Sequence, residues 1–120
     1  MGCGESQSVS ETSALYGQIS EATFTKQVIQ LARVLGWLSA HFRPGMTKRG
    51  GWVTAVSGDG VGFPDLILLR HNRRIMAELK AAKGKVTPEQ EAWLESAKRA
   101  EFEVYIWRPS DIDEIERVLR

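Results

Sequence analysis

Three charged residues stand in apolar segments, where charged groups are costly unless they are used. Asp65 lies near the start of segment 64–70, the most apolar of the chain, and Glu78 and Lys80 lie two residues apart in segment 74–81. If both segments are strands, Glu78 and Lys80 share one face, because side chains alternate along a strand. A carboxylate pair with a lysine beside it is suited to metal binding and to chemistry at a phosphate.

The two segments are expected to form a hairpin, because only the short turn 71–73 separates them. With Arg70 paired with about Arg74, Asp65 falls within one residue of Glu78. Two adjacent carboxylates repel each other and raise each other's pKa, and a divalent cation removes that cost. Ligands that are all oxygen favour Mg²⁺ or Mn²⁺ over zinc. Such a cation would polarise a phosphate and hold a water of lowered pKa.

A purely structural interpretation of the same residues stays open at this point. Asp65 could cap the turn after Pro64, and Glu78 with Lys80 could form a solvated, ion-paired face of an edge strand. Glu21 could complete the acidic cluster from the first turn of the first helix, although the helix dipole favours acids in any first turn.

The composition fits one globular domain and excludes several classes of protein. The chain has 120 residues, of which 42% are hydrophobic and 26% charged, which is too apolar for wholesale disorder. Cys3 is the only cysteine and the histidines His41 and His71 are far apart, which excludes an internal disulfide and a Cys-rich zinc site. The longest apolar run is far shorter than the roughly 18 residues of a membrane helix, so no membrane association is expected. A reducing, cytoplasmic compartment fits best, in a bacterial or phage-infected cell rather than a eukaryotic nucleus.

Positive charge is concentrated in the middle of the chain. Residues 41–85 carry nine basic and three acidic residues, a net of +6, whereas residues 1–40 have a net of −1 and residues 86–120 a net of −4. A basic middle between acidic ends indicates a face offered to a polyanion.

Periodicity places these residues in a mixed α/β domain. Residues 1–19 have no apolar period and are expected to be a mobile tail, so that the domain comprises residues 20–120. The sequence Thr-Pro-Glu-Gln at 87–90 predicts a helix start, with Thr87 as the cap and Gln90 as its capping-box partner. We expect helices at 20–36, at 87–100 and from Ser110, a loop at 43–51, and strands at 37–42, 52–56, 64–70, 74–81 and 102–107. The expected core order is α-β-β-β-α-β-α, which has one strand fewer before the second helix than this list, and the core is a mixed central sheet flanked by helices.

Three short motifs, in order and closely spaced, resemble a known family. They are Gly-Phe-Pro-Asp at 62–65, Glu-Leu-Lys at 78–80 and Thr-Pro-Glu-Gln at 87–90. Together with Val-Tyr-Ile-Trp-Arg-Pro at 104–109, they look like a virus-type replication-repair nuclease (VRR-Nuc) domain of the PD-(D/E)xK superfamily, over about residues 19–118. The resemblance implies a restriction-endonuclease-like core that hydrolyses DNA phosphodiester bonds with Mg²⁺ or Mn²⁺.

The resemblance also implies roles for individual residues. Asp65, Glu78 and the Leu79 backbone carbonyl would bind the metal. Lys80 would act on the nucleophilic water, and Gln90 would help to hold the site from the following helix.

One position departs from the family pattern. Related chains often carry Glu-x-Glu in the first helix, whereas here Thr23 stands at the second place and leaves Glu21 as the available carboxylate. Small members of the family resemble Holliday-junction resolvases and work as homodimers on branched DNA, and the same is implied for this chain.

Phosphate contacts are expected from basic and hydroxyl residues on either side of the proposed site. They are Arg43, Lys48, Arg49, Ser57, Arg73, Arg74, Lys83 and Lys85.

The leading hypothesis is therefore a metal-dependent endonuclease acting on branched or duplex DNA, and the alternative is a non-catalytic nucleic-acid-binding module of the same fold. A nucleotide-binding loop at 58–62 is disfavoured, because Pro64 and a strand follow the glycines where a helix would be needed. No nucleotide cofactor is expected.

Overall fold

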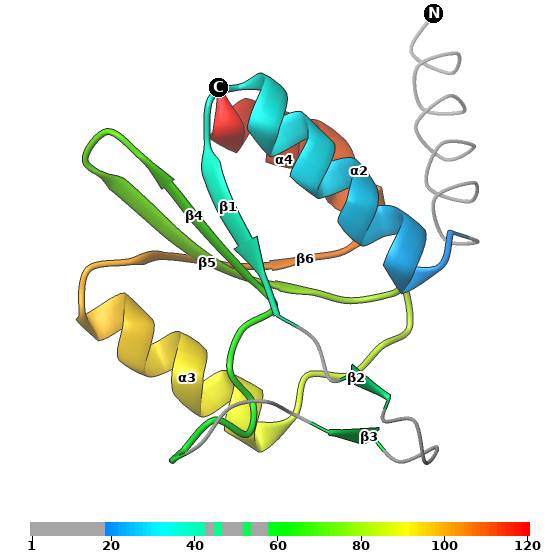
Figure 1. Cartoon of the computed structure of the whole chain (residues 1–120), viewed down its shortest axis with the longest axis vertical. Helices are drawn as coiled ribbons and strands as arrows, with labels where there is room; N and C mark the ends of the chain where they lie inside the picture. Colours follow the sequence, from blue (N-terminus) through cyan, green and yellow to red (C-terminus); the bar gives the residue numbers. More distant parts are fainter. Residues whose placement is uncertain (1–18, 43–44, 47–51, 54–57) are drawn as a thin grey trace, which may run out of the picture.

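The computed structural model of the protein describes residues 19–42, 45–46, 52–53 and 58–120. The elements along the chain are α2 (Glu21–Val34), β1 (Leu38–His41), β2 (Gly45–Met46), β3 (Trp52–Val53), β4 (Leu66–Arg70), β5 (Arg73–Leu79), α3 (Pro88–Arg99), β6 (Glu103–Trp107), a 3₁₀ turn (Pro109–Asp111) and α4 (Ile112–Leu119). Figure 1 shows their arrangement. The tail expected at 1–19 lies outside the described residues except for Ile19.

Four strands form the main sheet, in the order β1-β4-β5-β6. The β1–β4 and β4–β5 pairs are antiparallel and the β5–β6 pair is parallel. A connection between parallel neighbours needs a crossover, which α3 provides. The elements of this sheet with their helices follow the order α-β-β-β-α-β-α, which confirms the expected mixed sheet flanked by helices.

The strand expected at 52–56 does not belong to this sheet. Its described part, β3, pairs instead with β2, and β2 lies within the segment 43–51 that was expected to be a loop. Because β4 has β1 on one side and β5 on the other, β3 cannot pair with the strand that follows it in the sequence, and it forms a separate two-stranded sheet with β2. Residues 54–57 lie outside the described part.

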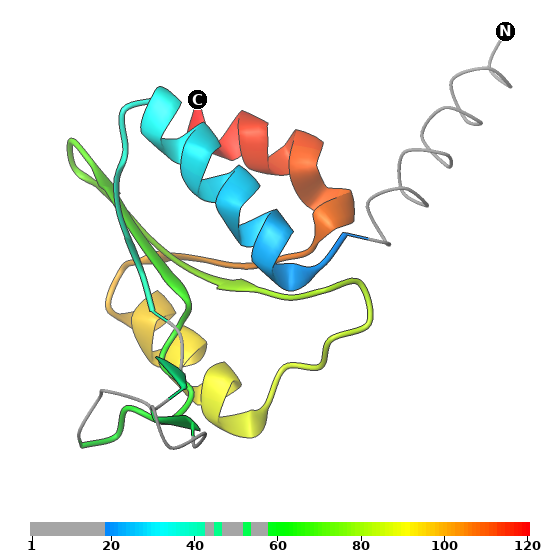
Figure 2. The ribbon, with the colours of Figure 1, turned by 45° about the vertical axis from the view of Figure 1, so that its right-hand side comes forward.

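Helices cover both faces of the sheet. Helices α2 and α4 pack together over one face, and α3 lies on the other (Figures 1 and 2). The alternate residues of β4 and β5 that face α2 and α4 are fully buried with apolar residues of both helices. This core comprises Phe24, Val28, Ala32, Trp37, Leu66, Leu68, Ile75, Ala77, Leu79, Trp107, Ile115 and Leu119.

The first helix begins and ends where its sequence predicts. The Ser20 side chain accepts a hydrogen bond from the Thr23 N–H as the N-cap, and the chain turns away after Leu35 at Gly36, whose φ is +86°. That left-handed conformation is one that glycine adopts without steric cost. None of the helices in the described ranges is long and apolar enough to cross a membrane.

Candidate active site

The β4–β5 turn is one residue tighter than expected. Arg70 pairs with Arg73, whereas the sequence suggested a pairing with about Arg74, so the predicted register was wrong by one residue. Only His71 and Asn72 lie between the paired residues, and His71 takes a φ of +54°. A two-residue turn of this kind needs a residue with a positive φ. Glycine or asparagine would have indicated such a turn in the sequence, whereas histidine does not.

The tighter turn brings the two predicted acids into direct opposition. Continuing the β4–β5 register by one residue places Asp65 opposite Glu78. Directly opposite residues on antiparallel strands have their side chains on the same face. Asp65 is anchored on both sides: its Oδ2 accepts from the Leu79 N–H at 2.9 Å, and its backbone carbonyl accepts from the Phe42 N–H at 2.7 Å.

Glu78 is the buried acid of the pair, with 1% of its surface exposed. Its Oε1 accepts from Gln90 Nε2 at 3.2 Å, while Oε2 is buried and has no hydrogen-bond partner among the described residues. Burial first, and then the neighbouring Asp65 carboxyl, raise the pKa of Glu78 to about 9. The charge of Lys80 lowers this pKa and that of Glu21 raises it. Ionisation of Glu78 is therefore unfavourable unless a positive charge lies nearby.

Glu21 differs from this pair in its surroundings. It lies exposed in the first turn of α2, on the helix layer opposite to α3. Its contribution to the pKa of Glu78 is the last of the causes. The part of the chain that the structure describes contains no group of three or more His, Cys, Asp or Glu side chains placed to hold a metal. Of the predicted acids, the structure therefore brings Asp65 and Glu78 together and leaves Glu21 apart from them.

Gln90 links the start of α3 to Glu78. Its Oε1 accepts from the Thr87 N–H at 2.9 Å, and its own N–H donates to Thr87 Oγ1 at 3.1 Å, which completes the predicted capping box. Because the amide oxygen is engaged by Thr87, the amide nitrogen is the atom left to face Glu78. The capping role and the contact with the acid are both present in one side chain.

The glycine-rich segment before Asp65 is docked against the same helix. Gly62 has a φ of +85°, and a Cβ at this position would lie 2.6 Å from the Glu89 carbonyl carbon. Trp93 Nε1 donates to the Asp59 carbonyl at 2.9 Å, and Phe63 packs edge-on against the Trp93 ring at 4.9 Å between centroids. The loop thereby ties the start of β4 to the first turns of α3, so that Asp65 and Gln90 are positioned together.

The predicted phosphate contacts divide into three groups. Arg43, Lys48, Arg49 and Ser57 lie outside the described residues. Lys83 and Lys85 are exposed on the loop that follows Lys80. Arg73 and Arg74 lie at the opposite end of the hairpin (Figure 1).

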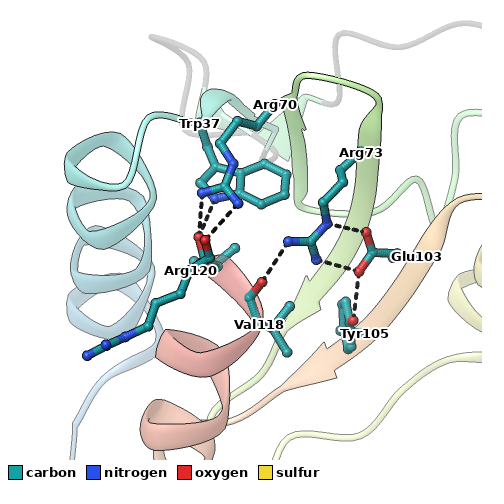
Figure 3. A network of polar contacts seen from close by, with 8 residues as sticks. Trp37, Arg70, Arg73, Glu103, Tyr105, Val118 and Arg120 are labelled. Atoms are coloured by element: carbon teal, nitrogen blue, oxygen red, sulfur yellow. Dashed lines mark hydrogen bonds and ion pairs between the residues drawn. The ribbon is translucent and has the colours of Figure 1, made fainter.

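At the turn of the hairpin, the arginines link the strands to β6 and to the end of α4 (Figure 3). Arg73 donates from Nε and Nη2 to both carboxylate oxygens of Glu103, at 2.8 and 2.7 Å, and from Nη1 to the Val118 carbonyl at 3.0 Å. This pairing raises the pKa of Arg73 and lowers the pKa of Glu103. Arg74 contacts Glu101 more loosely, with a 3.4 Å ion pair.

Arg70 fastens the end of α4 in the same region. It donates to the carbonyls of Leu119 and Arg120 at 2.7 and 2.9 Å, and its guanidinium lies 4.5 Å from the Trp37 ring centroid (Figure 3). Trp37 Nε1 donates to the same Leu119 carbonyl at 2.8 Å. Cations favour the carbonyl end of a helix, which explains the use of an arginine here.

Sequence reasoning missed one residue that contacts the site region. Arg108 follows β6 and donates from Nη1 to carbonyls of the loop after Lys80. The signal that could have revealed it is topological: the carboxyl ends of neighbouring parallel strands meet at one edge of a sheet, so that the residues following β5 and β6 lie close together.

A model of the VRR-NUC domain family matches residues 43–111, more than half of the chain. The chain belongs to this family. Searches of curated proteins and of solved structures found no match. The four-stranded mixed sheet flanked by helices is consistent with a restriction-endonuclease-like fold. Membership of the VRR-NUC family implies a nuclease-type function with DNA as the substrate, and such nuclease domains typically use divalent metals.

Proposed function

We propose that this VRR-NUC protein is a metal-dependent endonuclease of the PD-(D/E)xK type, which hydrolyses phosphodiester bonds of branched DNA. The observation that carries the proposal is the buried Glu78 carboxyl, which lies opposite Asp65 and has an Oε2 atom without a partner in the described structure. A buried carboxylate beside a second carboxylate is strongly disfavoured unless a cation or a proton compensates its charge.

The residues fit a hard divalent cation. Asp65 and Glu78 would hold Mg²⁺ or Mn²⁺ together with the Leu79 backbone carbonyl, because carboxylate and carbonyl oxygens are the ligands that these ions prefer. When bound, the ion would polarise the scissile phosphate and lower the pKa of a water. Glu21 is proposed as an additional acidic group at the edge of the site.

The neighbouring side chains have separate tasks in this proposal. Gln90 orients Glu78 by donating to Oε1, and Oε2 is left without a hydrogen-bond partner in the described structure. Lys80 shares the face of Glu78 and is partly exposed, so that its ammonium can donate to the attacking water or to a non-bridging phosphate oxygen. Lys83 and Lys85 continue the positive charge along the following loop and would contact the DNA backbone.

Branched DNA and a homodimeric assembly are the finer parts of the proposal. They are supported by the resemblance to small family members that act like Holliday-junction resolvases. A pair of identical sites would suit a substrate in which two strands must be cut.

Cleavage of a four-way junction and of a supercoiled plasmid, with Mg²⁺ or Mn²⁺, tests the proposal. Asp65→Asn, Glu78→Gln and Lys80→Met should each cut about 100-fold more slowly or worse. Asp59→Asn is the matched control, since Asp59 is an exposed acid of the adjacent loop that contacts Trp93 through its backbone alone. Undiminished cutting by the first three variants would refute the site. Salt-sensitive DNA binding with no cutting by the wild type in any metal would identify the non-catalytic binding module instead.

A further inference from the structure

Arg108 holds the loop that follows β5 through a single nitrogen. Its Nη1 donates to the carbonyls of Ala81 and Gly84, both at 2.7 Å, and to that of Ala82 at 3.4 Å. Hydrogen bonds from a charged donor are stronger than neutral ones, so three carbonyls converging on one guanidinium restrain the loop. Figure 2 shows this loop bending back from the end of β5 towards the start of α3.

The backbone of Arg108 is held in place by the 3₁₀ turn that follows it. Its backbone N–H donates to Asp111 Oδ2 at 2.8 Å, at the start of the 3₁₀ turn. The Trp107 carbonyl, one residue earlier, accepts from the Lys80 N–H at 3.0 Å and closes the β5–β6 pairing. Lys80 and Arg108 therefore leave adjacent ends of two parallel strands, and the loop held by Arg108 begins directly after Lys80.

The loop returns to Lys80 at Gly84. The Gly84 N–H donates to the Ala81 carbonyl at 3.0 Å, which closes a turn. A Cβ at Gly84 would lie 3.4 Å from Lys80 Cδ and 3.4 Å from the Ala81 carbonyl oxygen. The Gly84 backbone thus packs against the methylene stem of Lys80. A lysine stem has four rotatable bonds, and such a contact limits the directions that its ammonium can take.

We infer that Arg108 is a positioning residue for the nuclease reaction: it holds Gly84 against the stem of Lys80 and so keeps the Lys80 ammonium directed towards the Asp65–Glu78 pair. The inference rests on the proposed function, in which Lys80 acts at the scissile phosphate. Arg108 does not touch the pair in this arrangement, and its effect passes through the 81–84 loop.

Single-turnover cleavage over a range of DNA concentrations gives the first test. Arg108→Met should lower the maximal rate constant by about 10-fold or more and leave the half-saturating DNA concentration within about 2-fold, because Lys83 keeps its charge on the loosened loop whereas the Lys80 ammonium is no longer held in place. Arg108→Lys should recover part of the rate, since its ammonium can donate to one or two of the same carbonyls. A higher half-saturating DNA concentration with an unchanged maximal rate constant would overturn the inference.

A double-mutant comparison separates positioning from general stability. If Arg108 acts through Lys80, adding Arg108→Met to Lys80→Met should slow cleavage no further. An additional loss as large as that of the single Arg108 variant would overturn the inference.

A measurement on the metal-free protein needs no activity at all. In protein labelled with ¹³C-lysine, the Lys80 side-chain ε cross-peak is assigned by its disappearance in Lys80→Arg. Arg108→Met should move or narrow this peak and leave that of Lys98, on α3, unchanged. An unmoved Lys80 peak would overturn the inference even if cleavage fell. If Lys80→Met cut DNA like the wild type, the proposed function of Lys80 would fail, while a moved peak would still report the restraint by Arg108.

Discussion

Gln90 donates from its amide nitrogen to Glu78 Oε1 at 3.2 Å, while its amide oxygen is occupied by the backbone N–H of Thr87. The helix cap thereby determines which end of the amide faces the acid. A donor next to Glu78 favours the ionised form that a metal ligand needs, so a local folding signal and a site contact are joined in one residue.

Replacement of Gln90 by glutamate should separate these two roles. A glutamate at this position still completes the capping box, but it presents an oxygen to Glu78 in place of a donor. We expect Gln90→Glu to keep the free energy of unfolding within about 1 kcal/mol of the wild type and to cut DNA at least about 10-fold more slowly. Gln90→Ala loses the capping-box partner and the donor together, so both its free energy of unfolding and its rate of cleavage should fall. Chemical denaturation and junction cleavage measure the two effects, and full activity of Gln90→Glu would contradict the role assigned to the amide.

A methyl group at Gly62 should loosen the docking of the glycine-rich loop. An alanine there meets the backbone of Glu89 and must also adopt a φ of +85°. We expect Gly62→Ala to lower the free energy of unfolding by about 2–4 kcal/mol, the sum of conformational strain and overpacking. Gly58→Ala is the matched control, because Gly58 has a similar φ of +70° with nothing within 4 Å of its added Cβ. It should lose only about 1 kcal/mol. Equal losses in thermal or urea unfolding would show that the contact with Glu89 is unimportant.

Glu78 should make the metal-free protein less stable as the pH rises. Its carboxyl has an ordinary pKa of 4.5 and a pKa of about 9 in the fold, so the folded state binds the proton more tightly. Stability is then greatest below about pH 4.5 for this group and declines as the pH rises towards 9. Glu78→Gln removes the titration. In EDTA at pH 8.5 we expect the variant to exceed the wild type by about 1–3 kcal/mol in free energy of unfolding.

The same pair of proteins tests the proposed cation. Mn²⁺ should raise the melting temperature of the wild type by several degrees and that of Glu78→Gln far less, because one ligand is missing. Glu91→Gln, at an exposed acid of α3, is the control and should behave as the wild type in both measurements. Parallel pH profiles of the wild type and Glu78→Gln would contradict the raised pKa.

Lys83 and Lys85 should contribute to DNA affinity through the phosphate backbone alone. Each alanine variant is expected to bind a four-way junction, in Ca²⁺ to prevent cutting, about 2- to 10-fold more weakly at low salt. The slope of log affinity against log salt should fall in magnitude by about one for each lysine removed. Lys98→Ala, on the last turn of α3, is the control. An unchanged slope for both loop variants would remove this loop from the DNA interface.

The proximity of Asp65 and Glu78 could be anticipated from the sequence, since it depends on two local properties, strand alternation and a short turn. The capping box at Thr87 was equally local. The register differed by one residue because turn length depends on a backbone conformation at His71 that its side chain does not announce.

The contacts that the sequence did not reveal are those between distant segments. The indole N–H of Trp93 donates to the Asp59 carbonyl, 34 residues earlier in the chain. Arg108 reaches Gly84 across 24 residues. Such pairs arise only after the β5–α3–β6 crossover has folded, and no periodicity within either segment records them.

The guanidinium groups at the hairpin turn have a consequence for how DNA would approach the molecule. Of the nine basic residues in the central segment, Arg73 and Arg74 are engaged with Glu103 and Glu101, and Arg70 with backbone carbonyls of α4. A count of charges along the sequence, which ignores these contacts, would predict that the whole hairpin attracts DNA equally. In the folded molecule, Glu103 and Glu101 offset the charges of Arg73 and Arg74, whereas no ion pair engages Lys83 or Lys85 in the described part of the chain. We therefore expect a polyanion to be attracted more strongly to the loop after β5 than to the hairpin turn.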